Sequence, residues 1–245
     1  MISVEAPAKL TLSLAITGVR EDGYHLIDAE MVSLTICDDI VIEEAATTSI
    51  NVVGKFAQGV PTDDSNLVAR ALHLLNRHAE VRIEKNIPHG GGLGGGSSDA
   101  AAVLRAARFT DLVAASRIGA DIPFCMVGGR ARVTGIGEIV EPLAFVEHRL
   151  TLIIPPLQVS TPAVYAKWDS MGQPRGDQGN DLEPAAIAAY PEMATWRDRI
   201  ESVTGSRPFL AGSGATWFVY GQIPGVSAQL EGAQVVYTST RPQSE

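Results

Sequence analysis

Cysteine is scarce in this chain of 245 residues, which contains only Cys37 and Cys125. The two cysteines are far apart and fit no metal-ligand spacing, so neither a disulfide framework nor a cysteine-ligated zinc site is expected. We predict that both are reduced core thiols in a cytoplasmic protein. No apolar run approaches the roughly eighteen residues of a membrane-spanning helix. The first residues, MISVE, also lack the basic and apolar regions of a secretory signal.

Positive charge is scarce as well. The chain has 19 lysines and arginines against 28 acidic residues, giving a formal net charge of −9. A nucleic-acid-binding protein needs a basic face, so this composition argues against that class. An anionic small ligand would have to be held by a local positive site. Lysine is especially rare, and its positions are Lys9, Lys55, Lys85 and Lys167.

Glycine, in contrast, is concentrated in the stretch IPHGGGLGGGSSDAA. We predict a strand over 81–85, a loop over 90–96 and a helix that begins at Ser97 and Ser98. Six of the seven loop residues lack a side chain, so the backbone can adopt positive φ angles and approach a ligand closely. The loop N–H groups and the positive end of the helix dipole converge on one point, which predicts a phosphate site.

Three other interpretations of this loop fit less well. A flexible linker is rarely wedged between an apolar strand and an alanine-rich helix. The glycines match the dinucleotide pattern GxGxxG, but four residues separate them from the strand, and a helical stretch follows where a second strand belongs. A Walker loop is excluded because GxxxxGK[ST] does not occur.

The remaining chain alternates between strand and helix patterns. Strands are predicted at 2–17, 26–36, 39–43, 130–141 (a hairpin), 149–154, 208–211, 216–220 and 234–238. Helices are predicted at 66–78 (capped by Asp64 or Ser65), around Tyr165, and at 182–190 and 191–203. This order predicts an α+β fold with helices packed on mainly antiparallel sheets. The connection at 142–148 suggests a domain boundary, which divides the chain into residues 1–148 and 149–245.

Several polar residues allow two interpretations. On pattern alone, Lys9 is a solvated lysine at a strand edge, and Asp121, two residues before Pro123, is a helix N-cap. Alternatively, the two side chains are aimed at the ligand of the glycine loop. Tyr24 and His25 follow a glycine turn and could be packing residues or the lip of a binding site.

Three segments together resemble the GHMP small-molecule kinase superfamily: PAKLTLSLAITGVREDGYHLI, IPHGGGLGGGSSDAA with GADIPF, and AGSGATWFVY. The resemblance implies an N-terminal domain like ribosomal protein S5 domain 2 and a C-terminal ferredoxin-like domain. DGYH beside PAKL is typical of the subgroup that phosphorylates the 2-hydroxyl of a cytidylylated methylerythritol with ATP, in isoprenoid precursor biosynthesis. The rivals are GHMP kinases for homoserine, mevalonate or a sugar, and a non-catalytic nucleotide-binding relative.

The resemblance also implies a role for individual residues. Asp121 corresponds to the catalytic acid and Lys9 to its partner. The ATP-binding residues would be Pro88, His89, Gly90, Gly91, Gly92, Leu93, Gly94, Gly95, Gly96, Ser97, Ser98, Lys85 and Asn66. The acceptor-binding residues would be Tyr24, His25, Thr11, Tyr165, Gly212, Ser213 and Gly214, with Tyr24 and Tyr165 on opposite faces of the cytosine. Mg²⁺ would bind through ATP, with Ser97 as the candidate protein ligand, and the protein would be a monomer or homodimer.

The chain departs from the family in two ways. Thr11 stands where family members usually carry Asn, so a hydroxyl would have to remake one polar contact to the acceptor. The segments between Ala107 and Gly119 and between Tyr165 and Asn180 are shorter than is usual in the family, which affects the edges of the expected site.

Overall fold

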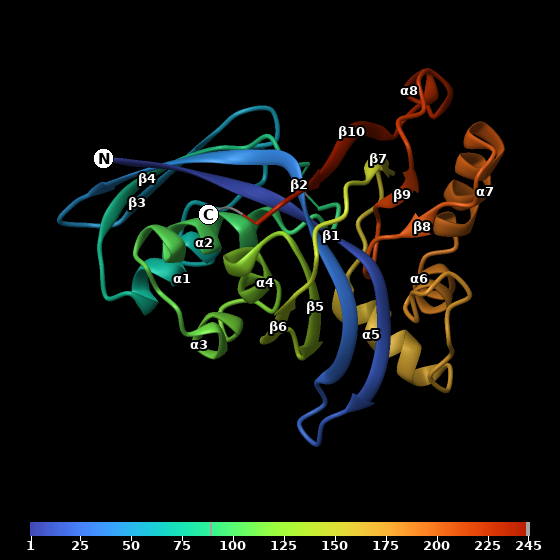
Figure 1. The fold of residues 1–245 in the computed structure, drawn as a ribbon, viewed down its shortest axis with the longest axis horizontal. Helices are drawn as coiled ribbons and strands as arrows, with labels where there is room; N and C mark the ends of the chain where they lie inside the picture. Colours follow the sequence, from blue (N-terminus) through green and yellow to red (C-terminus); the bar gives the residue numbers. More distant parts are fainter. Residues whose placement is uncertain (89, 244–245) are drawn as a thin grey trace.

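The computed structural model describes residues 1–88 and 90–243 (Figure 1). His89, which the resemblance assigns to the phosphate loop, lies outside the described residues. In chain order the elements are β1 (Ile2–Val19), β2 (His25–Glu44), β3 (Ser49–Val53), α1 (Leu67–Leu74), β4 (Ala79–Glu84), α2 (Gly95–Ala106), α3 (Leu112–Ser116), α4 (Ile122–Val127), β5 (Arg130–Gly135), β6 (Ile139–Pro142), β7 (Arg149–Ile154), α5 (Thr161–Ser170), α6 (Glu183–Ala189), α7 (Glu192–Thr204), β8 (Phe209–Leu210), β9 (Trp217–Tyr220), α8 (Val226–Gln229) and β10 (Gln234–Arg241).

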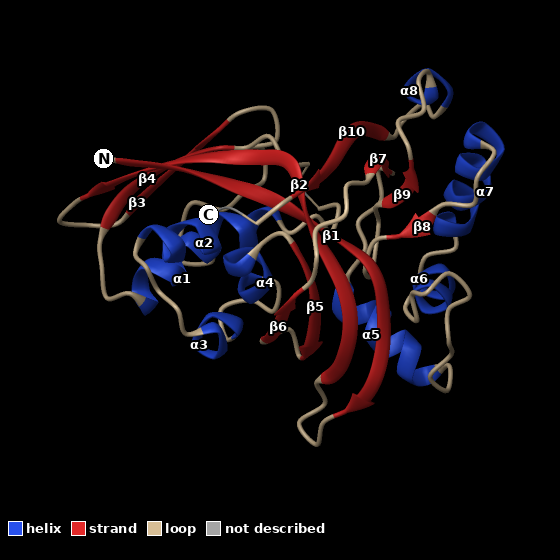
Figure 2. Ribbon diagram, viewed as in Figure 1, coloured by secondary structure: helices blue, strands red, loops and turns tan. Residues whose placement is uncertain are grey.

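The strands form one sheet with the order β3-β4-β2-β10-β7-β9-β8, to which β1, β5 and β6 are added through β2 and β5. Of the described pairings between named strands, only β3 with β4 is parallel. The predicted mixed fold with mainly antiparallel pairing is therefore confirmed. Helices α1, α2 and α4 lie together against the part of the sheet built from β1, β2 and β4 (Figure 2). Helices α6 and α7 lie beside β8 and β9, and α5 packs against α6 near the turn end of the hairpin of β1 and β2.

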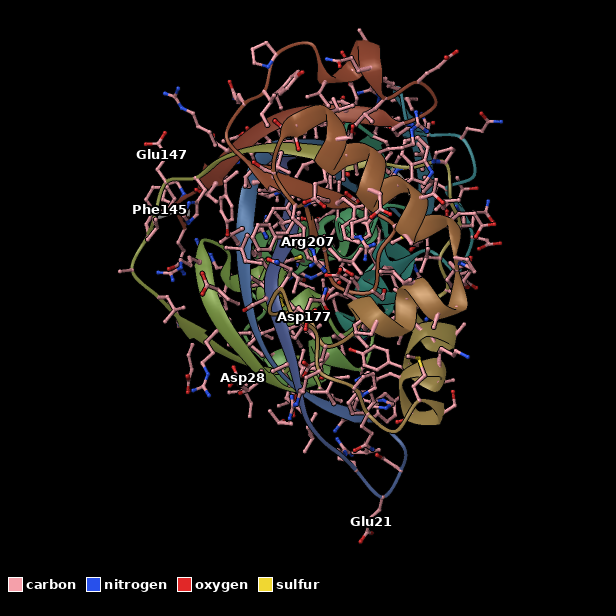
Figure 3. All side chains as sticks on the ribbon, turned by 90° about the vertical axis from the view of Figure 1, so that its right-hand side faces the viewer. Glu21, Asp28, Phe145, Glu147, Asp177 and Arg207 are labelled. Atoms are coloured by element: carbon pink, nitrogen blue, oxygen red, sulfur yellow. The ribbon has the colours of Figure 1, made fainter. Side chains whose placement is uncertain are left out.

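The long hairpin of β1 and β2 organises the molecule, and its turn, with Glu21, projects beyond the other elements (Figure 3). The prediction of two strands, 26–36 and 39–43, was wrong, because β2 continues from His25 to Glu44. The acidic pair Asp38-Asp39 is typical of a turn. Here Asp38 is fully buried and bonded to Lys85, Asn86 and Ile87, which directly follow β4, so the strand continues through it.

The alternating leucines of β1 do not face a single core. Leu10 and Leu12 pack in one hydrophobic cluster, whereas Leu14 and Ile16 pack in another. The pairing register with β2 shifts between Thr11 and Ser13, and such a bulge turns the following side chains to the other face. Both faces of the middle of β1 are consequently buried, which fixes the position of this strand.

Helix α1 is shorter than predicted and begins one residue later than its expected start. Its cap is Asn66, not Asp64 or Ser65, because the Asn66 side chain accepts a hydrogen bond of 2.8 Å from the backbone N–H of Val68. Cys125 is a buried thiol as predicted, but Cys37 is only half-buried. Both are free cysteines.

The two parts of the chain on either side of residue 148 are joined in the sheet. Strand β7 begins at Arg149, and β10 pairs with β7 on one side and with Leu34 and Ser33 of β2 on the other. The division into domains at this residue stays a prediction. Over the described ranges, no helix combines the length and apolar character needed to cross a membrane.

Candidate active site

Lys9 and Asp121 meet in space although they are far apart in the sequence. The Lys9 ammonium lies 3.1 Å from Oδ2 of Asp121, and the Lys9 side chain is 8% exposed. Lys9 is therefore not a solvated edge lysine. Asp121 does occupy the N-cap position of α4, but its side chain makes no capping hydrogen bond. Its carboxylate thus remains available to a ligand in the adjoining cavity, which it lines.

The glycine loop runs over Lys9 and leads into a helix as predicted, but α2 begins at Gly95, two residues before the predicted start at Ser97. The backbone N–H of Lys9 donates to the carbonyl of Leu93 at 3.0 Å. A Cβ at Gly94 would lie 2.6 Å from Cγ of Lys9, and a Cβ at Gly92 would lie 2.9 Å from the carbonyl oxygen of Gly214. At these two positions the loop is too close to the rest of the protein for any side chain. Glycine is thus required here by packing as well as by the positive φ angles of 69° and 72°.

The first turn of α2 can accept an anion. The helix is 12 residues long, and its N-cap, Gly94, provides no side-chain hydrogen bond to the first backbone N–H groups. These N–H groups and the helix dipole are the usual components of a phosphate site. Ser97 lies beside them and lines the cavities. Ser98 is fully buried, and its hydroxyl proton is already donated to the carbonyl of Pro7.

Two cavities meet at the glycine loop. The larger, of about 1220 Å³, is lined by Lys9, Thr11 and Asp121 at the loop, and extends to Tyr24, His25 and Tyr165. The smaller, of about 290 Å³, is lined by Asn66, Lys85, Pro88, the residues from Gly90 to Ser97, and Asp99. Gly92 and Ser97 line both. The predicted ATP-binding residues in the described ranges, apart from Ser98, therefore surround the smaller cavity, and the predicted acceptor residues, apart from Gly214, line the larger one.

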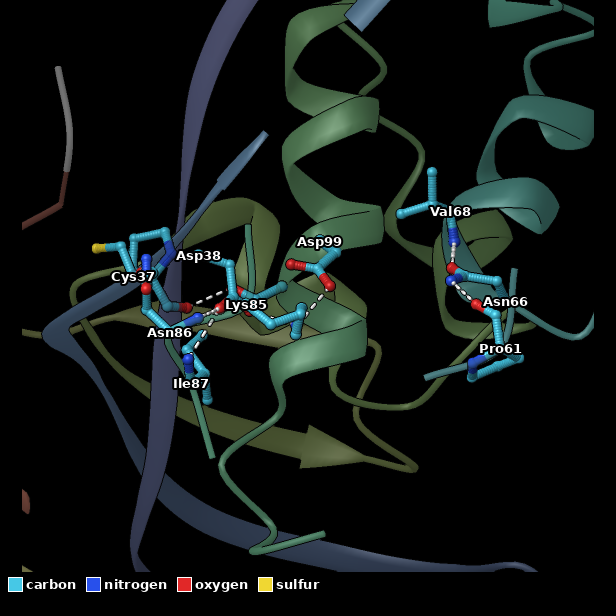
Figure 4. A network of polar contacts seen from close by, with 11 residues as sticks. Cys37, Asp38, Pro61, Asn66, Val68, Lys85, Asn86, Ile87 and Asp99 are labelled. Carbon is cyan, nitrogen blue, oxygen red and sulfur yellow. Dashed lines mark hydrogen bonds and ion pairs between the residues drawn. The ribbon is translucent and has the colours of Figure 1, made fainter. Parts of the chain in front are cut away.

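A buried group of charges forms one wall of the smaller cavity (Figure 4). The Lys85 ammonium lies 2.7 Å from Oδ2 of Asp99 and also forms an ion pair with Asp38. Asp38 in addition accepts hydrogen bonds of 2.6 and 2.8 Å from the backbone N–H groups of Asn86 and Ile87. Two of the three protons on the Lys85 ammonium are thus used within the protein, which leaves one for a ligand.

Asp99 is unusual within this group. Burial raises the pKa of its carboxyl to about 7, although the neighbouring Lys85 ammonium acts in the opposite direction. Its Oδ1 atom is buried and has no hydrogen-bond partner among the described residues. Sequence analysis missed both Asp38 and Asp99, because their partners lie 47 and 14 positions away in the chain.

Asn66 also lines this cavity. Its side-chain amide donates a hydrogen bond of 2.6 Å to the carbonyl of Pro61.

At the far end of the larger cavity, His25 is held by two residues of α5. Its ring centroid lies 4.6 Å from that of Tyr165, and its Nε2 lies 2.9 Å from Oδ1 of Asp169. Burial raises the pKa of Tyr165 to about 12. Tyr24 is 60% exposed and makes no ring contact with Tyr165 among the described aromatic pairs. The structure thus places His25 against Tyr165, whereas Tyr24 is exposed in the cavity wall with the Arg20 guanidinium 5.9 Å from the centre of its ring.

The third glycine segment is positioned by a residue that sequence analysis missed. Asn180 is 2% exposed, and its amide nitrogen donates to the carbonyls of Leu210 at 2.8 Å and Gly212 at 2.7 Å. Its neighbours pair with β1, because Leu14 donates to the carbonyl of Gly179 and accepts from the N–H of Asp181. This segment therefore connects the strand of Lys9 to the glycine turn across the cavity.

Two further contacts involve residues that the sequence predicts to bind the acceptor. The Lys9 ammonium donates to Oγ1 of Thr11 at 3.3 Å. The hydroxyl groups of Ser213 and Thr161 lie 2.8 Å apart. Thr161 was not singled out in the sequence, since a serine or threonine at the start of a helix is adequately explained as part of a cap.

Known proteins match the chain over most of its length. The profile of the GHMP kinases N terminal domain matches residues 66–129. A protein of Paracoccus denitrificans (strain Pd 1222), named 4-diphosphocytidyl-2-C-methyl-D-erythritol kinase, is 40% identical over 236 residues, covering 87% of this chain and 84% of the relative. A protein of the same name from Cereibacter sphaeroides (strain ATCC 17029 / ATH 2.4.9) is 38% identical over 246 residues, covering 89% and 88%.

Solved structures agree with these matches. A crystal structure of 4-(cytidine 5'-diphospho)-2C-methyl-D-erythritol kinase has a TM-score of 0.78 and 27% identity, with 100% of both chains covered. A homoserine kinase from Cytophaga hutchinsonii ATCC 33406 has a TM-score of 0.62 at 14% identity, covering 100% of this chain and 95% of the other, and shows the shared fold alone.

The fold and the loop-centred site define a small-molecule kinase of the GHMP type. Within that superfamily, the chain belongs to the family of 4-diphosphocytidyl-2-C-methyl-D-erythritol kinases.

Proposed function

We propose that this protein transfers the γ-phosphoryl group of ATP to the 2-hydroxyl of 4-(cytidine 5'-diphospho)-2-C-methyl-D-erythritol, a step of non-mevalonate isoprenoid precursor biosynthesis. The observation that carries the proposal is the ion pair of Lys9 and Asp121, 3.1 Å long, which lines the larger cavity beside the glycine loop. The names of the relatives supply the acceptor. The two-domain arrangement of the superfamily and a cytoplasmic location, where both free cysteines would stay reduced, are part of the same proposal.

The residues of the smaller cavity fit a nucleoside triphosphate. The loop offers backbone N–H groups without side chains, and α2 offers the positive end of its dipole. Mg²⁺ prefers phosphate oxygens and water over a dedicated protein cage. Residues 1–88 and 90–243 contain no group of three or more His, Cys, Asp or Glu side chains that could hold a metal ion. Ser97 is the residue placed to add a hydroxyl ligand. When bound, the ion would neutralise phosphate charge.

Asp121 and Lys9 would act on the acceptor. An alcohol is a weak nucleophile and needs a base within hydrogen-bond distance as it attacks. The Asp121 carboxylate would take the proton of the 2-hydroxyl while its oxygen forms a bond to the γ-phosphorus and the bond from that phosphorus to ADP breaks. The Lys9 ammonium would lower the electrostatic cost of charge developing on the attacking oxygen. Thr11, which contacts Lys9, would orient the same end of the acceptor.

The far end of the cavity would recognise the cytosine. His25, whose ring contacts that of Tyr165 at an interplanar angle of 36° and which is hydrogen-bonded to Asp169, is held in one orientation. Tyr24 is free to cover the base, since its ring is exposed at the cavity mouth. Stacking of a base on an aromatic ring contributes about 1–3 kcal/mol, which is enough to distinguish a cytidylyl compound from a bare alcohol.

An ADP-release assay tests the proposal. ADP should form with ATP and the cytidylyl acceptor together, and not when the acceptor is omitted or replaced by homoserine or mevalonate. If homoserine or mevalonate were phosphorylated as fast as the cytidylyl acceptor, the protein would instead have another GHMP kinase activity. Absence of ADP release with every acceptor, in a protein that still binds ATP, would support the non-catalytic alternative.

A further inference from the structure

Arg117 lies on the wall of the larger cavity, directly after α3 and on the loop that leads to Asp121. Sequence analysis gave it no role, and it belongs to one of the segments that are shortened relative to the family. Its side chain is exposed. Within the described residues, its guanidinium forms neither a salt bridge nor a hydrogen bond with another side chain.

Each of the other basic side chains of this cavity, including His25 with Asp169, already has a carboxylate partner. Lys9 pairs with Asp121, and Arg20 lies 2.7 Å from Oδ2 of Asp22. The remaining charged residues of the cavity wall are acidic, namely Glu138 and Asp169. A nucleoside diphosphate brings negative charge on both phosphorus groups into this space. Arg117 is the cavity cation whose charge is not offset by a neighbouring carboxylate in the described residues.

The loop also places Arg117 at a suitable separation from the reacting end. Four residues lead from Arg117 to Asp121, and a fully extended chain of that length spans at most about 14 Å. The loop is held in place by hydrogen bonds of 3.0 Å from Ile118 to the carbonyl of Ala115 and from Ile122 to that of Gly119. In the acceptor, the diphosphate is attached to carbon 4 and the reacting hydroxyl to carbon 2, so the two groups are only a few bonds apart.

We infer that Arg117 binds the diphosphate of the acceptor and selects acceptors that carry one. This inference rests on the proposed function and adds to it the residue that recognises the diphosphate of the substrate. A guanidinium can donate two parallel hydrogen bonds to phosphate oxygens, which a lysine ammonium cannot reproduce. The alternative is a solvated arginine at the end of a short helix, which would not distinguish between ligands.

Calorimetric titration with cytidine and with CDP tests the inference. A non-hydrolysable ATP analogue is kept saturating, so that CDP cannot occupy the smaller cavity. Arg117→Gln should weaken CDP binding roughly 10- to 100-fold, the usual effect of losing charge-assisted hydrogen bonds, and should leave cytidine binding nearly unchanged. Arg117→Lys should show an intermediate loss for CDP. Arg77→Gln removes the same charge from an exposed site outside the cavity and serves as the control.

The outcomes separate the two proposals. If Arg117→Gln leaves the preference for CDP over cytidine unchanged, or if Arg77→Gln reduces it equally, the role of Arg117 is refuted and the proposed function stands. If neither cytidine nor CDP binds to the wild-type protein, the cytidylyl acceptor itself is wrong. Thermal unfolding of both variants should match the wild type, because both arginines are exposed.

Discussion

The ammonium group of Lys9 lies 3.1 Å from Oδ2 of Asp121, while the backbone N–H of the same lysine donates to Leu93 in the glycine loop. One residue of β1 thus contacts both the candidate base and the candidate phosphate loop. Any shift of the loop that displaces Lys9 would also disturb its ion pair, so we expect the proposed phosphate binding and the proposed activation of the acceptor to be coupled.

Replacement of the candidate base should abolish most turnover. Asp121→Asn should lower kcat roughly 10²- to 10⁴-fold, the scale of general-base catalysis, with little change in KM for ATP. Steady-state ADP release measures both quantities. Glu138→Gln neutralises another carboxylate of the same cavity and should lose far less activity. Near wild-type turnover in Asp121→Asn would rule out its role as the base.

The close packing of the loop on Lys9 can be tested with two glycines. Gly94 and Gly90 both have positive φ, so alanine is strained at either position. A Cβ at Gly94 would lie 2.6 Å from Lys9 Cγ, whereas one at Gly90 would have no atom within 4 Å. Gly94→Ala should therefore reduce kcat roughly 10- to 100-fold more than Gly90→Ala, because small displacements of catalytic groups are costly. Equal kcat values would show that the contact is unimportant.

We expect Asn180 to affect binding of the acceptor and not binding of ATP. Asn180→Asp keeps the shape of the side chain but removes both hydrogen bonds to the carbonyls of Leu210 and Gly212. We expect KM for the acceptor to rise roughly tenfold, corresponding to about 1.4 kcal/mol, with KM for ATP nearly constant. Ile200→Val, in the core away from the cavity, provides a control of reduced stability. If KM for the acceptor rose similarly in Ile200→Val, the effect of Asn180→Asp would be due to reduced stability alone.

Asp99 should make stability fall as the pH rises. Burial raises its pKa to about 7 in the folded protein, whereas an unfolded aspartate titrates near 3.9. Between these values the folded state binds a proton that the unfolded state has lost, so unfolding free energy decreases with pH and the contribution is lost above about 7. The free energy of unfolding measured with urea should therefore be about 2 kcal/mol lower at pH 7 than at pH 5. Asp99→Asn should remove most of the difference, and an unchanged difference would assign it to other groups.

The sequence predicted what depends on local pattern. The glycine loop, the strand before it and the helix after it were evident because backbone conformation and dipole follow from neighbouring residues. Lys9 and Asp121 had equally good local explanations, as an edge lysine and a helix cap, and only the family resemblance favoured a shared site. Their convergence depends on the packing of β1 against α4, which no local pattern contains.

The functional residues that sequence analysis missed were all missed for the same physical reason. The predicted strand ended before Asp38 because an acidic pair rarely lies in a strand interior. The groups that make its burial favourable, the Lys85 ammonium and the backbone N–H groups of Asn86 and Ile87, lie 47 to 49 positions away. Asn180 resembles an ordinary loop residue, yet it bonds to carbonyls 30 and 32 positions further on. Polar groups that satisfy distant backbone atoms leave no periodic signal, so their function appears only in the folded structure.

The hairpin of β1 and β2 has a consequence for the choice of acceptor. Lys9 lies in the middle of β1, His25 lies at the start of β2, and the two strands are paired from Ile2 to Val19. This pairing fixes the separation along the ribbon between Lys9, at the proposed phosphoryl-transfer point, and His25, at the proposed base-recognition end. We therefore expect that a compound with a suitable base and a suitable alcohol, but with a shorter spacer, would engage one of these proposed ends and miss the other.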